Sequence, residues 1–350
     1  MPESKDIGFR VAAHDYDTDG DLDLFVGGRV KQGKWPLTPQ SLVLHNNGGS
    51  FTDLTADFGA AFQQCGMVTD LVWENIDSDP QPELIVVGEW MPVTIFKFKN
   101  NKLENVTEQF GLGKSNGLWF RVAVADLDGD GDKDIVTGNF GLNTRLVASA
   151  DFPLPCYAKD FDNNGQIDPL MAYAEAGKTY PMVQKEVLNK QIPQLRKKFI
   201  YGEVYGNATI EDVYPKKELK EALNLQAHTL ETCWWENKGG KFVQRKLPNQ
   251  AQTSPVQGIL VDDFTGDGIA DILMAGNKYN MEVETNRCDA SNGVLLRGDG
   301  RGNFSFVENT ASGFWASKEA RDLSVLRLAG GKKAVLVTNN TGALQVFAGK

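Results

Sequence analysis

Acidic side chains recur at every second position in a short segment near the start of the sequence. Residues 15–28 read DYDTDGDLDLFVGG, in which a run of alternating carboxylates leads into an apolar run. Related segments occur at 126–139, 160–173 and 263–277, and a more divergent one lies at 75–90. Two carboxylates about 4 Å apart repel one another by roughly 1 kcal/mol in water and by roughly 4 kcal/mol at an effective dielectric constant of about 20. Each cluster therefore requires a neutralising cation.

The chemistry of these loops favours calcium. They offer carboxylate, amide, hydroxyl and backbone oxygens, and no His or Cys belongs to any copy. An all-oxygen ligand set of this charge suits Ca²⁺ better than Mg²⁺, which retains its waters. The spacing resembles the start of an EF-hand loop, with ligands at positions 1, 3 and 5 and Gly at position 6, but an acidic residue at position 9 and a β-type run follow. The alternative, plain acidic turns, is disfavoured by four copies in one register.

We predict about four structural calcium ions, one in each well-formed loop. Side-chain oxygens at positions 1, 3, 5 and 9 and the backbone carbonyl at position 7 are the expected ligands. The four sets are Asp15, Asp17, Asp19, Asp21 and Asp23; Asp126, Asp128, Asp130, Asp132 and Asp134; Asp160, Asp162, Asn164, Gln166 and Asp168; and Asp263, Thr265, Asp267, Ile269 and Asp271.

The second loop in chain order departs from this pattern. It retains oxygen ligands at Asn75, Asp77, Asp79 and Glu83, but Pro80 replaces the glycine. Proline locks φ near −65°, whereas the other loops place glycine where the chain must turn sharply. We expect this loop to bind metal weakly or not at all.

Composition narrows the class of protein. The chain has 350 residues, 41% of them hydrophobic, and a formal net charge of −10, which argues against nucleic acid as the main partner. Its four cysteines are widely spaced, so neither a zinc site nor a disulfide-rich scaffold is indicated. No apolar run approaches the length of a transmembrane helix, so we expect contact with a membrane to be peripheral at most.

The segments between the loops read as short strands. In the first unit, strands at 9–13 and 22–26 flank the loop, and strands at 41–45 and 51–54 follow around an Asn-Asn-Gly-Gly turn. Similar starts give six detectable units, the last of them, at 322–338, without a metal loop. The chain enters its first repeat near the N-terminus and ends on an apparent strand, which suggests a domain excised from a larger or processed protein.

Residues 184–226 break the repeat. Apolar side chains recur there at helical spacing, at Val187, Leu188, Ile192 and Leu195 and again from Leu219 to the end of the segment, and the segment is slightly basic. We predict a helical insertion at about 184–226. A solvated pair of helices is the favoured interpretation, and a partner-binding surface is the alternative.

The repeated DxDxDGxxD motif followed by an apolar strand resembles the FG-GAP/VCBS repeat family, the calcium-binding β-propellers related to the integrin α-subunit head. The insertion and its flanking loops look like the bacterial surface or secreted type. The resemblance implies an all-β fold, a β-propeller of about seven four-stranded blades, with residues 1–350 forming a single domain. It also implies calcium loops between the first two strands of a blade.

These observations favour a non-catalytic, calcium-stabilised binding, adhesion or scaffold module that recognises a protein or glycan partner. We expect an extracellular, cell-surface or periplasmic location in a bacterial envelope, because external Ca²⁺ fills even modest sites and resting cytosol does not.

The alternative is a polysaccharide lyase or hydrolase on a calcium-bearing propeller. It finds little support, because there are only three histidines, His14, His45 and His228, and no GxSxG, HExxH or phosphate-loop motif.

Two further patterns have simple structural explanations. The Arg-Gly-Asp tripeptide at 297–299 lies in an expected hairpin turn, and at least one of Trp234 and Trp235 should be core, because neighbouring strand residues face opposite sides.

Overall fold

Five antiparallel sheets stand side by side as blades in the computed structural model, which describes residues 6–281 and 285–348. Blade 1 contains β1 (Ile7–His14), β2 (Asp23–Val30), β3 (Leu42–Asn47) and β4 (Ser50–Asp53). Blade 2 contains β5 (Met67–Glu74), β6 (Glu83–Met91), β7 (Thr94–Lys99) and β8 (Lys102–Asn105), with β9 (Gly117–Leu118) added beside β6. The short helix α1 (Ala60–Gln63) joins these two blades.

The next three blades follow the same plan. Blade 3 contains β10 (Arg121–Ala125), β11 (Asp134–Gly138), β16 (Cys233–Asn237) and β17 (Phe242–Lys246). Blade 4 contains β18 (Val256–Asp262), β19 (Asp271–Gly276), β20 (Val294–Gly298) and β21 (Phe304–Val307), and α6 (Asn309–Ser312) follows it. Blade 5 contains β22 (Ala320–Arg327), β23 (Lys333–Asn339) and β24 (Gln345–Ala348). The predicted all-β class is thus confirmed.

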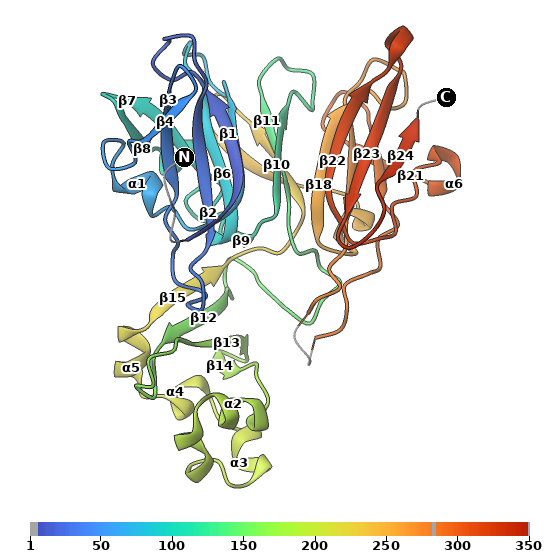
Figure 1. Cartoon of the computed structure of the whole chain (residues 1–350). Helices are drawn as coiled ribbons and strands as arrows, with labels where there is room; N and C mark the ends of the chain where they lie inside the picture. Colours follow the sequence, from blue (N-terminus) through green and yellow to red (C-terminus); the bar gives the residue numbers. More distant parts are fainter. Residues whose placement is uncertain (1–5, 282–284, 349–350) are drawn as a thin grey trace.

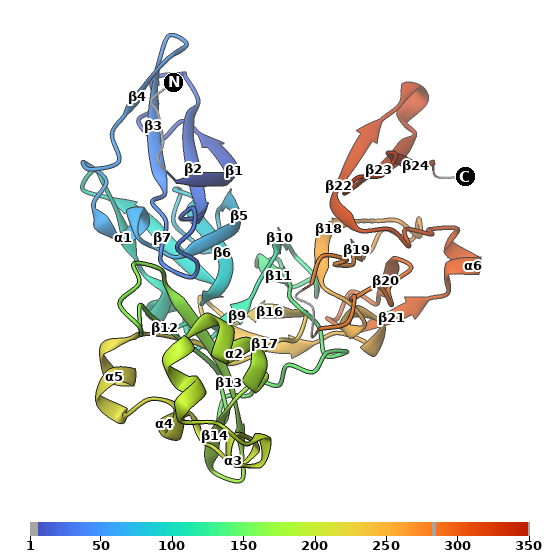
Figure 2. The same ribbon diagram turned by 60° about the horizontal axis from the view of Figure 1, so that its bottom comes forward.

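The alternation of side chains along each inner strand packs one blade against the next. In β10, Val122 and Val124 join the apolar cluster shared with blade 2, while Ala123 and Ala125 join the cluster shared with blade 4. Successive strand residues point to opposite faces of a sheet, so one strand supplies both interfaces. Figure 2 shows the resulting arc, with blades 1 and 5 at its two ends.

The outward faces of the two end blades retain exposed apolar side chains. Val11 of β1 is 55% exposed, and Leu326 of β22 is 45% exposed. The described residues therefore form an arc of five blades, and the predicted number of about seven is not confirmed.

The unit around the fourth loop is not a blade of this arc, which corrects the count of six starts. It is a separate sheet with the strand order β14-β13-β12-β15, inserted between β11 and β16 of blade 3. Its strands are β12 (Leu154–Lys159), β13 (Asp168–Glu175), β14 (Lys178–Pro181) and β15 (Leu223–Ala227). In the blades, the strand before a loop is the inner edge of its sheet. Here β15 covers the equivalent strand, β12, through pairs such as Cys156 with Leu225.

The predicted helices lie in this same insertion. They are α2 (Lys185–Gln191), α3 (Gly202–Gly206), α4 (Ile210–Val213) and α5 (Lys216–Glu221). They share an apolar cluster with the inserted sheet, to which each contributes one or more side chains: Leu188, Tyr205, Val213 and Leu219. The end of the expected second helix is wrong, because Leu223 and Leu225 belong to β15. Figure 1 shows the insertion below the blades, at the end opposite to the β10–β11 loop. The assignment of residues 1–350 to one domain stays a prediction.

Trp119 tests the packing between blades 2 and 3. Its side chain is fully buried in their shared cluster, and its indole Nε1 donates to the carbonyl of Ser115 at 3.0 Å. We expect Trp119→Ala to lower the free energy of unfolding by about 3–5 kcal/mol, because it leaves a large cavity.

Chemical denaturation measures this loss. The control is Trp315→Ala, whose side chain is 49% exposed and whose removal should cost about 0.5 kcal/mol or less. Equal losses for the two variants would contradict the proposed packing.

Candidate metal centres

The first aspartate of each well-formed loop holds the turn together. It accepts hydrogen bonds from backbone amides later in the loop, as Asp15 does from Asp19 at 3.2 Å and from Gly20 at 3.1 Å. The loops headed by Asp126, Asp160 and Asp263 repeat the bond to the glycine at position 6. That glycine has φ between 82° and 96° in all four loops, a left-handed conformation that other residues adopt only with strain. The Asp and Gly spacing therefore determines the shape of the loop.

The acidic residue at position 9 lies at the start of the second strand and is buried. Asp23, Asp134, Asp168 and Asp271 are at most 3% exposed, and each accepts a hydrogen bond from the amide at position 2 of its loop. Asp134 also accepts from Asn237 in β16 at 2.8 Å. Burial raises the pKa of Asp134 to about 7, although these hydrogen bonds act to lower it. Among the residues that the structure describes, the ionised form has no cationic partner, and a cation in the loop would supply one.

Four loops bring three carboxylates together, and in the second loop these are Asp77, Asp79 and Glu83. The side chains at positions 1, 3 and 9 place ligand oxygens within 4.8 Å of one another in the first, third and fourth loops. These groups are Asp15, Asp17 and Asp23; Asp126, Asp128 and Asp134; and Asp160, Asp162 and Asp168. Three convergent carboxylates fit a hard divalent cation.

The residues at positions 5 and 7 are linked to each other in every well-formed loop. The backbone amide of Asp21, Asp132, Gln166 or Ile269 donates to the side-chain oxygen of Asp19, Asp130, Asn164 or Asp267, at 2.8 to 3.0 Å. In the first loop the side chain of Asp21 also accepts from Gly48 at 2.7 Å. These contacts fix the loop backbone. The groups at positions 1, 3 and 9 do not include these positions, but Asp19 belongs to a second possible metal group, with Asp17 and His45.

His45 joins the first loop, which the sequence analysis missed. Its Nδ1 lies 3.1 Å from Asp23 Oδ1 and 3.6 Å from Asp17 Oδ2. The pairing of Leu24 with Leu44 between β2 and β3 brings His45 to this position. The predicted strand at 41–45 contains His45, but only the register between β2 and β3 shows that its side chain reaches the first loop. His14, in contrast, stacks on Trp73 with ring centroids 4.5 Å apart, and burial lowers its pKa.

An ammonium group lies among the carboxylates of the second loop. Lys97 Nζ, from β7, forms ion pairs with Asp77, with Asp79 at 2.5 Å and with Glu83 at 3.2 Å. Burial acts to lower the pKa of Lys97, but the hydrogen bonds to these three carboxylates raise it above its ordinary value. Lys97 therefore neutralises the loop from within the chain, which supports the expectation of weak or lost metal binding.

The fifth loop offers fewer carboxylates than the other three well-formed loops. Position 3 is Thr265, so only Asp263 and Asp271 supply carboxylates at positions 1 and 9. Arg297 binds the carboxylate at position 5, because its Nη2 and Nε lie 2.8 and 3.0 Å from Asp267 Oδ2. The arginine of the Arg-Gly-Asp tripeptide is thus occupied within its own blade.

Other candidate residues have structural surroundings. Trp234 and Trp235 are both buried, which leaves neither exposed for stacking on a sugar. The cysteines are unpaired, and burial raises the pKa of Cys65 to about 11 and the pKa of Cys156 and Cys233 to about 12. Such thiols stay protonated near neutral pH and are poor nucleophiles. No helix in the part of the chain that the structure describes is long and apolar enough to span a membrane.

The fold and loops define an all-β protein built from blade-like sheets with acidic turns. Comparison with protein families then shows that the chain contains an FG-GAP-like repeat, matched at residues 75–137. This match runs from the second loop through the third loop, and the same loop pattern recurs outside it.

The remaining comparisons are with curated proteins and with solved structures. No curated protein matches the chain. One similar solved structure is described as "Crystal structure of BBS1N in complex with ARL6DN, soaked with mercury". The alignment covers 100% of this chain and 95% of that one, at 11% identity and a TM-score of 0.27. A TM-score this low supports no inference about function.

Lys97 gives a direct test of the second loop. We expect Lys97→Met to destabilise the protein in chelator by about 3–5 kcal/mol, because it leaves the buried Glu83 and its neighbours without a counter-charge. Millimolar Ca²⁺ should restore much of this loss by taking the place of the ammonium group.

Denaturant unfolding with and without Ca²⁺ measures both effects. The matched control is Lys99→Met on the same strand, whose side chain is 66% exposed and whose ion pair with Glu104 is long, at 3.9 Å. It should change stability by about 0.5 kcal/mol or less. A Lys97→Met protein as stable in chelator as the unmodified protein would contradict this role.

Proposed function

We propose that this protein is a non-catalytic binding or scaffold module whose blades are stabilised by Ca²⁺. The observation that carries this proposal is the convergence of three carboxylates in each of three loops, one of the three being buried in every case. Such carboxylates repel one another when no cation is bound. A bound Ca²⁺ would attract all three and would hold the loop against the start of the next strand.

The ligand sets differ in strength between loops. The first, third and fourth loops are the main sites, with the side chains at positions 1, 3 and 9 as their central ligands. The side chain at position 5 and the backbone carbonyl at position 7 complete the set. The fifth loop is a weaker site, because Arg297 neutralises Asp267. Lys97 takes the place of the ion in the second loop.

A binding role suits this arrangement better than catalysis. The loop carboxylates are held by backbone amides, and His45 is held by Asp23. A polysaccharide lyase or hydrolase would need a free acid or base beside a substrate cleft. The proposed partner is a protein or glycan, and the proposed location is the extracellular space, cell surface or periplasm, where Ca²⁺ is abundant.

Thermal unfolding in Ca²⁺ and in chelator tests the proposal. A ligand that binds only the folded state stabilises it by about 2.7 kcal/mol per site at 100 times its Kd, so the melting temperature should rise with Ca²⁺ and less with Mg²⁺. An equal melting temperature in Ca²⁺ and chelator would overturn the calcium role.

A matched pair of variants assigns the effect to a loop. Asp128→Asn removes a central ligand of the third loop but leaves the turn-forming Asp126 intact, so it should reduce the calcium-dependent shift. Asp151→Asn, at an exposed position outside the loops, is the control and should leave the shift unchanged.

A further inference from the structure

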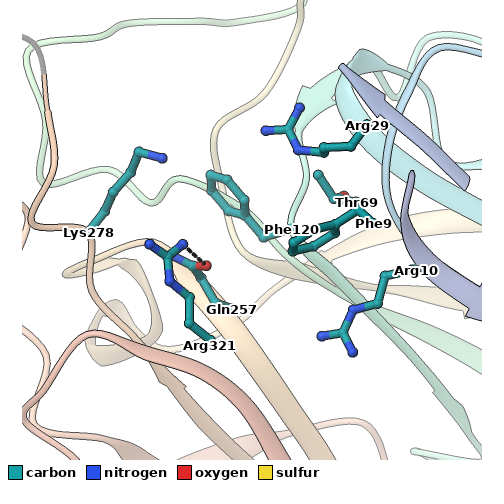
Figure 3. Close-up of a pocket in the computed structure, with 8 residues that line it drawn as sticks. All are labelled: Phe9, Arg10, Arg29, Thr69, Phe120, Gln257, Lys278 and Arg321. Carbon is teal, nitrogen blue, oxygen red and sulfur yellow. Dashed lines mark hydrogen bonds between the residues drawn. The ribbon is translucent and has the colours of Figure 1, made fainter. Parts of the chain in front are cut away.

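A cavity of about 100 Å³ lies where all five blades meet, at the end of the inner strands opposite to the metal loops. Its wall contains side chains from the early part of the inner strands and from their neighbours. They are Phe9, Arg10, Arg29, Thr69, Phe120, Gln257, Lys278 and Arg321. Figure 3 shows the cationic ends of Arg29, Lys278 and Arg321 arranged around the ring of Phe120, with Arg10 turned away from them.

The charge of this wall is opposite to that of the protein. Four of its eight side chains are cationic and none is a carboxylate, although the chain carries a net charge of −10. A concentration of positive charge from separate blades costs free energy through mutual repulsion unless an anion offsets it. Three of the four cations are already paired within the chain, Arg10 with Asp322 at 2.7 Å, Arg29 with Glu89 and Arg321 with Glu319, so Lys278 is the cation of the wall whose charge no carboxylate among the described residues offsets.

Carboxylates behind the wall hold the arginines in place. Arg29 Nη2 lies 2.6 Å from Glu89, Arg321 Nη2 lies 2.6 Å from the buried Glu319, and Arg321 Nη1 donates to Gln257 at 2.9 Å. A guanidinium group has five N–H donors, so these contacts leave donors free. The arginines are therefore fixed in position before a ligand arrives, which lowers the entropy lost on binding.

Lys278 supplies charge without a counter-ion. Among residues 6–281 and 285–348, no carboxylate lies within ion-pair distance of its ammonium group, which sits 5.8 Å from the centre of the Phe120 ring. The backbone of Lys278 is held by two hydrogen bonds with Cys288, at 2.7 and 2.9 Å. An anion in the cavity would give this ammonium group its missing partner.

We propose that this cavity binds an oxyanion group, such as a sulfate, phosphate or carboxylate. Arginine forks match the geometry of such groups, and charge-assisted hydrogen bonds are among the strong ones. A single water needs about 10–15 Å³ of such cavity space, so the cavity has ample room for an oxyanion group. The site extends the proposed binding role, but it uses none of the metal loops and does not depend on calcium.

Isothermal titration of the full chain with sodium sulfate and with sodium acetate tests the proposal, at constant ionic strength set with chloride and in the presence of Ca²⁺. We expect saturable binding of at least one of the two anions. Tighter sulfate binding would assign a tetrahedral oxyanion to the cavity, and tighter acetate binding would assign a carboxylate. No saturable binding of either anion would overturn the proposal.

Variants at Lys278 separate the cavity from general electrostatics. Lys278→Gln breaks no ion pair in the described structure, so it should fold normally and weaken anion binding about tenfold or more. Lys278→Arg should retain binding, and Lys246→Gln, an 83% exposed side chain on β17, is the control for net charge. Unchanged affinity in Lys278→Gln would overturn the proposal.

Failure of the anion-site proposal can be told apart from failure of the calcium proposal, because each has its own measurement. Anion binding without a calcium-dependent melting shift would remove the calcium role and leave the cavity. A calcium-dependent melting shift without anion binding would retain the calcium role and overturn the cavity proposal.

Discussion

The buried carboxylate at the end of each loop is the constraint on which the blades depend. Asp134 binds the amide of Leu127 at one side and the amide of Asn237 at the other, so one side chain joins the loop to the third strand of its sheet. Asp23 and Asp271 make equivalent bonds to Asn46 and Gly298. An ionised group in such a position is unfavourable unless a positive charge accompanies it.

The protein meets this demand for positive charge in more than one way. In the first, third and fourth loops the carboxylates converge as a divalent cation requires. The second loop uses Lys97, and the fifth loop partly uses Arg297. A tethered ammonium or guanidinium group stabilises its loop whatever the Ca²⁺ concentration. Divergent copies of the repeat can therefore retain the blade without the cation that we propose for the other loops.

Opposite charges are separated along the axis of the blade arc. Acidic loops follow the ends of the inner strands, and the cationic cavity lies near their beginnings. The inserted sheet and helices lie at this second end, and Phe120, which lines the cavity, also packs in the cluster that joins the blades to the insertion.

Much of the local structure could be read from the sequence by itself. Alternating carboxylates with Gly at position 6 define the loop, because glycine alone takes the left-handed conformation there without strain. The apolar runs after Asp23 and after Asp134 predict β2 and β11, and the helical spacing around Leu188 predicts α2. These patterns are local, since the residues that satisfy them are neighbours in the chain.

Only the tertiary structure decided how distant segments meet. Thr137 pairs with Cys233 across the whole insertion, so the fourth loop could not be recognised as part of an inserted sheet. His45 and Lys97 reach their loops through strand register, which local periodicity does not specify. The cavity joins Phe9 to Arg321, from the first and last blades. Its chemistry depends on the gathering of the five blades around one axis, which no spacing within a single repeat encodes.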